Sequence, residues 1–156
     1  MNEKPPTLYE WAGGDEALER LFETFYGKVR EDPLLEPVFR DMDREHPKHV
    51  ATWLGEVFGG PPLYTEEHGG YPHMMRKHLN RGLTEEMRRR WVDLICDAAD
   101  EVELPPDPEF RSAFVAYLEW GTRIAVANSQ PGAKPPLEAP VPHWGWGEAP
   151  PYNPGT

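Results

Sequence analysis

Apolar residues recur at steps of three and four along most of this chain, and this helical period is the feature that most restricts its fold. The longest such stripe begins at Phe110 and continues to Ala125. Shorter stripes cover residues 18–29, 50–58 and 87–98. No segment shows the alternation of apolar and polar residues that predicts a half-buried β-strand. The sequence therefore predicts an all-α protein.

Capping residues and helix breakers divide the stripes into separate helices. These signals stand at Gly13-Gly14-Asp15, Asp32-Pro33, Gly59-Gly60-Pro61-Pro62, Thr84 and Pro105-Pro106-Asp107-Pro108. Asp15 is expected to cap the helix that carries the first stripe. Residues 34–39 are expected to form one or two short turns, and residues 72–79 about two turns of helix. Residues 63–70 show no period and are expected to be irregular.

The chain changes character beyond residue 128. At 156 residues it fits one domain, which we place at residues 1–128. Residues 129–156 hold eight prolines between glycines and aromatic residues, so neither helix nor strand is expected there. Two interpretations stay open for this segment. It is an extended polyproline tail, or its Trp144, Trp146 and Tyr152 pack back on the domain or contact a partner.

Composition restricts the partners and the compartment. The formal net charge is −11, which disfavours nucleic acid, because binding to phosphates depends on clustered Lys and Arg. An acidic surface suits solubility or docking to a basic protein, and we favour solubility. No run approaches the roughly 20 apolar residues of a membrane span. The opening residues lack a secretory signal, and Cys96 is the only cysteine, so we expect a cytoplasmic protein without disulfides.

The motifs of several common chemistries are missing. The histidines stand at positions 46, 49, 68, 73, 78 and 143, without the spacing of a zinc site. A metal clamp that joins the pair at 46 and 49 to the pair at 73 and 78 remains an alternative. Neither a P-loop, a nucleophile elbow nor a dinucleotide fingerprint is found. What remains is a helical chain with aromatic residues at stripe positions, which indicates a cored helical domain.

Six local motifs follow one another between residues 7 and 128. They are Leu8-Tyr9-Glu10-Trp11-Ala12-Gly13-Gly14, Phe25-Tyr26, Asp32-Pro33, Phe58-Gly59-Gly60-Pro61 with Tyr64, Met75-Arg76-Lys77-His78 and Arg90-Trp91-Val92. In content and order they resemble the truncated haemoglobins, in particular the second group of that family. The resemblance implies a two-over-two helical sandwich around haem b in residues 1–128, with residues 129–156 as a Pro-rich C-terminal extension.

The resemblance also implies roles for individual residues. His78 stands where the family has its proximal ligand, a neutral imidazole bonded to iron; without the resemblance it is an ordinary helix histidine. Tyr26 and Trp91 stand where relatives donate hydrogen bonds to the bound ligand, although both also suit plain core packing. His46 matches the distal position, but Pro47 disfavours helical geometry for it and leaves its direction open.

Further residues match positions that surround the cofactor in the family. Phe39 matches the aromatic residue that wedges against haem. Four residues are expected to line the apolar cavity, namely Val50, Trp53, Leu54 and Leu94. Five more stand where relatives hold the haem propionates, namely His49, Tyr64, His73, Arg76 and Lys77. Exposed basic side chains are otherwise simply solvated, so the last set is also consistent with ordinary surface.

The function that the resemblance implies is reversible binding of oxygen, nitric oxide, carbon monoxide or a similar diatomic molecule at haem iron. Trp91 and Tyr26 would donate hydrogen bonds to partly negative oxygen and slow its release. Nitric oxide dioxygenation or peroxide chemistry would need an external reductase, so enzyme status stays open. Self-association into a homo-oligomer also stays open. The rival hypotheses are a haem-based sensor or carrier that signals through residues 129–156 to a partner, and a haem-free interaction module.

Overall fold

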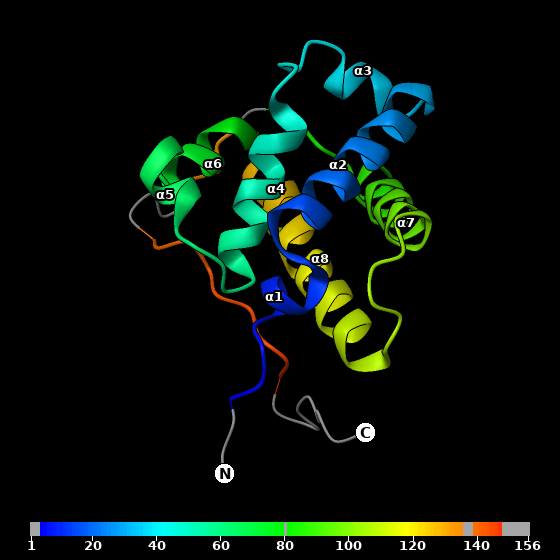
Figure 1. Cartoon of the computed structure of the whole chain (residues 1–156). Helices are drawn as coiled ribbons and strands as arrows, with labels where there is room; N and C mark the ends of the chain where they lie inside the picture. The colour runs from blue at the N-terminus through cyan, green and yellow to red at the C-terminus, as the bar shows by residue number, and fades with distance from the viewer. Residues whose placement is uncertain (1–3, 80, 136–138, 148–156) are drawn as a thin grey trace.

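The computed structural model describes residues 4–79, 81–135 and 139–147. Over these ranges its regular secondary structure is helical throughout (Figure 1). The helices are α1 (Leu8–Ala12), α2 (Gly14–Glu31), α3 (Glu36–Phe39), α4 (His46–Val57), α5 (Leu63–His68), α6 (Tyr71–His78), α7 (Glu85–Glu101) and α8 (Pro108–Asn128). The prediction of an all-α protein is confirmed.

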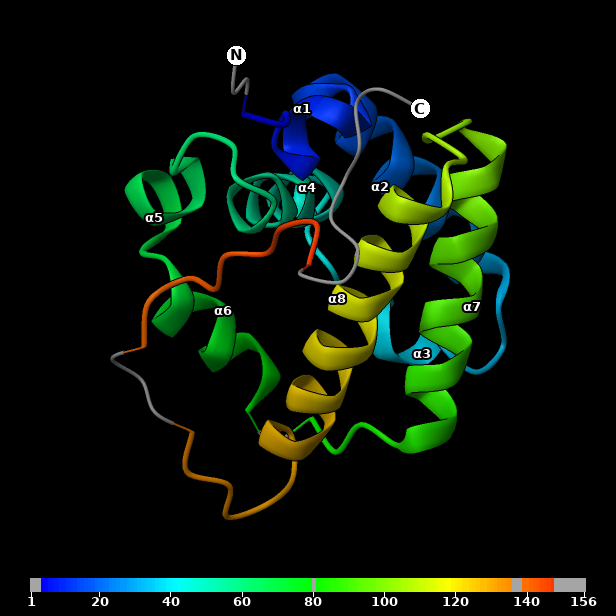
Figure 2. The same cartoon turned by 90° about the horizontal axis from the view of Figure 1, so that it is seen from below.

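The four long helices form two packed pairs. Helix α2 packs on α4, α7 packs on α8, and α2 also contacts α7, which joins the pairs. Figure 2 shows α7 and α8 side by side, with α2 and α4 beyond them. This is the two-over-two arrangement that the motifs led us to expect. None of the helices in the described ranges combines the length and apolarity that crossing a bilayer requires.

The first two helices are separated by a glycine in a left-handed conformation. The Thr7 hydroxyl accepts a hydrogen bond from the Glu10 backbone at 3.0 Å and so caps α1. Gly13, with φ of 112°, ends α1 and also takes the N-cap position of α2. The expectation that Asp15 caps α2 is therefore wrong. Because the turn is completed at Gly13, Asp15 falls inside the first turn, where its charge still suits the helix dipole.

Residues 63–70, expected to be irregular, contain the short helix α5. Six residues are too few to display a helical period, and Tyr64 is the residue of α5 that becomes buried. The helix is fixed by tertiary bonds instead. Both the backbone N–H and the hydroxyl of Thr65 donate to the buried carboxylate of Glu56 on α4. Gly69 then ends α5 with a φ of 87°.

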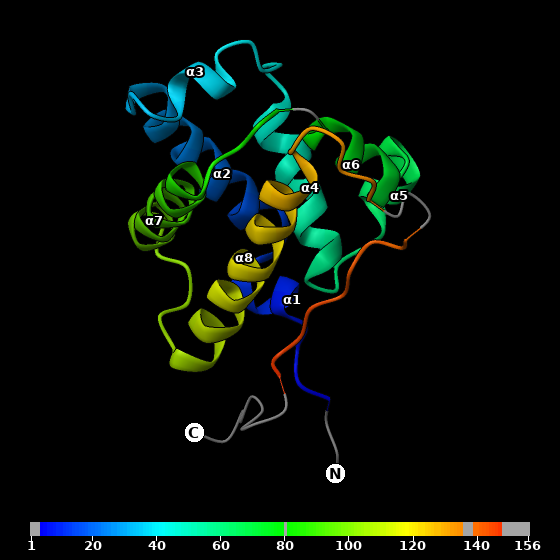
Figure 3. The same cartoon turned by 180° about the vertical axis from the view of Figure 1, so that it is seen from behind.

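The chain beyond α8 turns back onto the helices. Figure 3 shows residues 129–135 passing α6 and residues 139–147 running toward α1. The backbone N–H of Trp144 donates to the Val57 carbonyl at 2.7 Å, and the Trp146 indole donates to the Pro6 carbonyl at 2.7 Å. Of the two interpretations of the tail, packing against the domain therefore holds for both tryptophans. Tyr152 lies outside the described residues.

Candidate functional site

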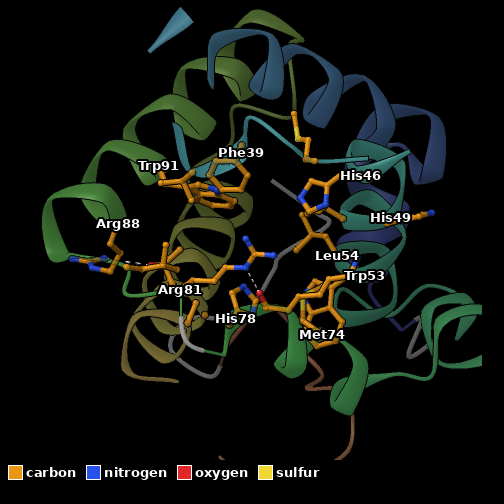
Figure 4. A pocket seen from close by; sticks show the side chains of 18 of the residues that line it. Phe39, His46, His49, Trp53, Leu54, Met74, His78, Arg81, Arg88 and Trp91 are labelled. Carbon is orange, nitrogen blue, oxygen red and sulfur yellow. Dashed lines mark hydrogen bonds between the residues drawn. The ribbon is translucent and has the colours of Figure 1, made fainter. Parts of the chain in front are cut away.

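A cavity of about 660 Å³ lies between the helices (Figure 4). Its walls come from α2, α4, α5, α6, α7 and α8, from the residues in and around α3, from the loop after α6, and from Pro142 of the tail. A volume of this size falls within the range of about 300–1,000 Å³ that small-molecule and cofactor sites occupy. The cavity is therefore large enough for a sizeable ligand rather than for a few water molecules.

One wall of the cavity carries His78, the last residue of α6. Burial lowers the pKa of His78, and a backbone hydrogen bond with Met74, one turn earlier, partly offsets this effect. His78 is therefore neutral near pH 7 and has a nitrogen lone pair available. Histidines that bind metals commonly use a second ring hydrogen bond of this kind to fix the direction of the ring.

Tyr26 and His46 form a hydrogen-bonded pair in the lining of the cavity. The Tyr26 hydroxyl lies 2.9 Å from Nε2 of His46. Burial, followed by the nearby positive charge of Lys77, lowers the pKa of His46 to about 4, while burial raises the pKa of Tyr26. The pair therefore consists of a neutral imidazole and a protonated phenol at neutral pH.

The direction of His46, which the sequence left open, is inward. Helix α4 begins at His46, so Pro47 falls in the first turn, where its missing N–H leaves no hydrogen bond unmade. The ring of His46 lies 5.0 Å from the Tyr26 ring and 6.2 Å from the Phe39 ring. In Figure 4, His46 and Phe39 lie on the far side of the cavity from His78.

Trp91 lines the cavity from α7 and belongs to a chain of aromatic contacts. Its ring packs edge-to-face on Phe25 at 4.8 Å, and Phe25 packs in the same manner on Tyr26 at 4.8 Å. These contacts fix the rotamers of both polar aromatic residues. The phenol of Tyr26 and the indole of Trp91 are thus two hydrogen-bond donors held in one cavity.

A second group of aromatic residues lines another part of the cavity. The Trp53 indole donates to the Tyr117 hydroxyl at 2.8 Å, and both residues are buried. Tyr64 lies edge-on to Trp53 at 5.2 Å and is fully buried. Its hydroxyl has no hydrogen-bond partner among the described residues. A buried phenol in this situation favours a ligand that brings an acceptor, because an unmade hydrogen bond costs about 1–3 kcal/mol.

Known bacterial proteins are similar to this chain in sequence and in fold. The model of the bacterial-like globin family matches residues 7–121. The group 2 truncated hemoglobin YjbI of Bacillus subtilis (strain 168) is 37% identical over 117 residues, which cover 75% of this chain and 86% of that relative. This chain belongs to the truncated haemoglobins, in their second group. The family membership expected from the motifs is confirmed.

Solved structures of second-group globins superpose on this truncated haemoglobin. The group II protein of Bacillus anthracis gives a TM-score of 0.72 at 30% identity and covers 83% of this chain and 98% of its own. The truncated oxygen-avid haemoglobin of Bacillus subtilis gives a TM-score of 0.69 at 36% identity, with coverages of 78% and 99%. The two-over-two fold is thus confirmed by comparison as well as by packing.

Most of the residues expected at the site of this globin lie in the cavity lining. These are Tyr26, Phe39, His46, His49, Val50, Trp53, Leu54, Tyr64, Lys77, His78 and Trp91. The described lining does not include His73, Arg76 or Leu94. The His73 ring lies 6.0 Å from the Tyr64 ring, Arg76 is exposed, and Leu94 packs against the core. Cofactor contacts of these three residues stay predictions.

The lining also contains side chains that sequence reasoning missed. They include Met42, Met74, Arg81, Leu83, Met87, Arg88, Tyr117, Leu118 and Ile124. Several of them carried a usable signal. Met74 stands one turn before His78, Met87 begins the stripe of α7, and Tyr117, Leu118 and Ile124 belong to the long apolar stripe of α8. Arg81 carried none. It follows α6 in a loop, where its guanidinium donates to the Lys77 carbonyl.

The residues of the cavity fit a haem group. Globin haems are held by one neutral histidine in a mostly apolar cavity, with polar donors on the ligand side, and His78, Tyr26 and Trp91 supply these features. The cationic Lys77 and the hydroxyl of Tyr64 provide partners for carboxylates that enter the same cavity. Within the described ranges, no group of three or more His, Cys, Asp or Glu side chains is placed to hold a metal ion by itself.

Proposed function

We propose that this truncated haemoglobin binds haem b through His78 and reversibly takes up oxygen or a similar diatomic molecule beside Tyr26, His46 and Trp91. One observation carries the proposal. A single neutral imidazole lines the cavity from α6, while a hydrogen-bonded phenol and imidazole line it from α2 and α4. This is the asymmetry that a globin needs between the side that holds the cofactor and the side that receives the ligand.

Haem iron, when bound, supplies the coordination position at which a diatomic molecule is taken up. The chain supplies the surroundings. His78 remains neutral at pH 7 because burial lowers its pKa, so its free nitrogen is ready to coordinate. Lys77, His49 and Tyr64 are the proposed partners of the two carboxylates of the cofactor. The Phe39, Val50 and Leu54 side chains exclude water from the rest of the cavity.

The Tyr26–His46 pair controls where the phenolic hydrogen points. A neutral imidazole carries one N–H, on either nitrogen. With the hydrogen on Nε2, His46 donates to the Tyr26 oxygen, and the hydroxyl hydrogen is free to face a ligand. With the hydrogen on Nδ1, Tyr26 donates to His46 and is withdrawn. The Trp91 indole is always a donor, because it has no acceptor lone pair in the ring plane.

The relatives support oxygen as the ligand. One of the superposed Bacillus subtilis structures is described as an oxygen-avid haemoglobin. If the Tyr26 hydroxyl and the Trp91 indole both reach the bound ligand, they stabilise oxygen, which becomes partly negative when bound, more than a neutral ligand. Oxidation of nitric oxide or reaction with peroxide would consume electrons from an external donor, so the proposal is limited to binding.

The proposal is tested by the visible absorption spectrum of the purified chain with haem, reduced and then exposed to oxygen or carbon monoxide. We expect an intense Soret band that shifts with each gas. His78→Ala should weaken the band strongly, whereas His143→Ala, which removes an exposed histidine of the tail, should leave it unchanged. A chain that refuses added haem, or an unaltered spectrum of His78→Ala, would overturn the proposal.

A further inference from the structure

The tail segment, residues 139–147, forms part of the wall of the cavity. We propose that Trp144 of this segment is a positioning residue, which acts through Tyr117 to keep Trp53 in place and so slows the loss of haem. This inference rests on the proposed function. It goes further in assigning the C-terminal extension to the cofactor site rather than to a separate linker.

Three anchors fix the tail segment to the helices. The backbone N–H of Trp144 donates to the carbonyl of Val57 at the end of α4, at 2.7 Å. The Trp146 indole donates to the Pro6 carbonyl at 2.7 Å. Between the start of the segment and these bonds, the side chain of Val141 is only 6% exposed. A backbone bond, a side-chain bond and a buried apolar residue within six positions define one conformation.

The ring of Trp144 lies against the outer side of the cavity wall. It packs edge-to-face on Tyr117 at 5.6 Å and at 35° to Trp120, also at 5.6 Å. On another side the Tyr117 ring lies close to the backbone of Gly121, one turn later in α8, where even an added Cβ would lie only 3.3 Å from the ring. Trp144 therefore restricts a tyrosine that already has little room to move.

Tyr117 is in turn bonded to Trp53, a residue that lines the cavity. Its hydroxyl accepts the hydrogen bond of the Trp53 indole at 2.8 Å. Both residues line the cavity, whereas Trp144 is not among the described lining residues. The route from the tail to the cofactor site consequently runs through Tyr117. A ring that shifts here removes the acceptor of a buried indole, which costs free energy in addition to the lost packing.

The tail segment also lines the cavity directly, through Pro142. Pro142 lines the cavity together with Trp120 of α8, two residues before the anchored backbone of Trp144. Haem is retained in large part because it buries apolar area. Water that enters beside it reduces this favourable free energy and weakens the bond between the histidine and the iron. Loosening the tail segment is therefore expected to speed the departure of haem.

The test measures the rate at which haem leaves the full-length holoprotein for an excess of a haem-free globin, followed by the Soret band. Trp144→Ala should increase this rate about threefold to tenfold, the range that corresponds to the loss of the aromatic pair with Tyr117. Trp144→Phe should restore most of the native rate, since it keeps a ring against Tyr117. His143→Ala is the matched control, because it changes an exposed side chain of the same segment.

A double-mutant comparison tests the route through Tyr117. Tyr117→Phe keeps the ring but removes the acceptor of the Trp53 indole. In this background Trp144→Ala should add less than about twofold to the rate of haem loss, because the coupled interaction is already absent. Thermal unfolding of each holoprotein, followed by circular dichroism, confirms that the rates are compared between folded proteins.

The outcomes separate this proposal from the proposed function. A native rate of haem loss in Trp144→Ala, or equal acceleration in Trp144→Ala and His143→Ala, would overturn the positioning role while haem binding itself stands. An equal effect of Trp144→Ala in the native and Tyr117→Phe backgrounds would overturn the route through Tyr117. A native chain without a Soret band would instead refute the proposed function.

Discussion

The hydroxyl of Tyr26 lies 2.9 Å from Nε2 of His46, and both side chains line the cavity that also contains His78. The bond connects α2 to the first residue of α4 and thereby joins the two helices on the side of the cavity where we propose that the ligand binds. It is a bond between neutral groups at pH 7, because burial raises the pKa of Tyr26 and lowers that of His46 to about 4. Because neither group is charged, the pair needs no counterion, and the position of the imidazole N–H decides which way the Tyr26 hydroxyl hydrogen points.

The first prediction concerns the Tyr26 hydroxyl. Tyr26→Phe keeps the ring and its contacts with Phe25 and Phe39 but removes one donor, so oxygen should leave about tenfold faster or more. Stopped-flow measurement of oxygen release checks this. Carbon monoxide serves as the control ligand, because it develops less negative charge, and its release should change less. An unchanged rate for oxygen would remove Tyr26 from ligand stabilisation.

The second prediction concerns Trp91. Trp91→Phe retains an aromatic ring against Phe25 and loses the indole N–H, and it should speed oxygen release severalfold. Trp11→Phe is the matched control, since the Trp11 indole donates to Asp107 at the surface and Trp11 is not among the described lining residues. The same stopped-flow assay applies. Equal rates in both variants would show that the Trp91 indole does not contact the ligand.

Much of the helical framework could be predicted because its signals are local. The N-cap at Thr84 and the cap with proline at Asp107-Pro108 mark the starts of α7 and α8, and the structure places both helices there. Helix α5 could not be found in this way. Its stability depends on bonds from Thr65 to Glu56, nine residues earlier in the chain, and a window of local sequence does not contain that information.

Without the family resemblance, a site residue could be expected only where it lies on a regular helix face. Phe25, Tyr26 and Trp91 follow the stripes of α2 and α7, so their burial or their place in the lining could be expected. Arg81 lies in a loop, and no period indicates where its side chain points. The direction of His46 depended on the residue at which α4 begins, and element boundaries are the least certain part of a sequence-based prediction.

The third prediction concerns acid sensitivity of the haem-free chain. The pKa of His46 is about 4 in the fold and near 6.5 when unfolded. Between these values the unfolded chain binds a proton that the folded chain does not, so the free energy of unfolding falls as the pH falls. His46→Gln should show a shallower decline over this window in urea unfolding. Both proteins share every other residue, so parallel curves would contradict the lowered pKa of His46.

The last prediction addresses the turn that connects α2 to α3. The Asp32 side chain is only 7% exposed, and its Oδ1 accepts hydrogen bonds from the backbone of Leu34 at 2.9 Å and of Leu35 at 3.1 Å. Oδ2 accepts from Arg90 at 3.0 Å, which ties the turn to α7 next to Trp91. Asp32→Ala should lower the free energy of unfolding by about 1–3 kcal/mol, because the buried N–H of Leu35 and the partly buried N–H of Leu34 lose their acceptor.

Asp32→Asn separates the two contributions of this carboxylate. It keeps an oxygen for the backbone N–H groups of Leu34 and Leu35 and loses the ion pair with Arg90, whose side chain is 49% exposed. Half-exposed ion pairs contribute about 1 kcal/mol at most, so this variant should be clearly more stable than Asp32→Ala in urea unfolding. Equal losses would mean that the ion pair, rather than the capping of the turn, stabilises the contact between α2 and α7.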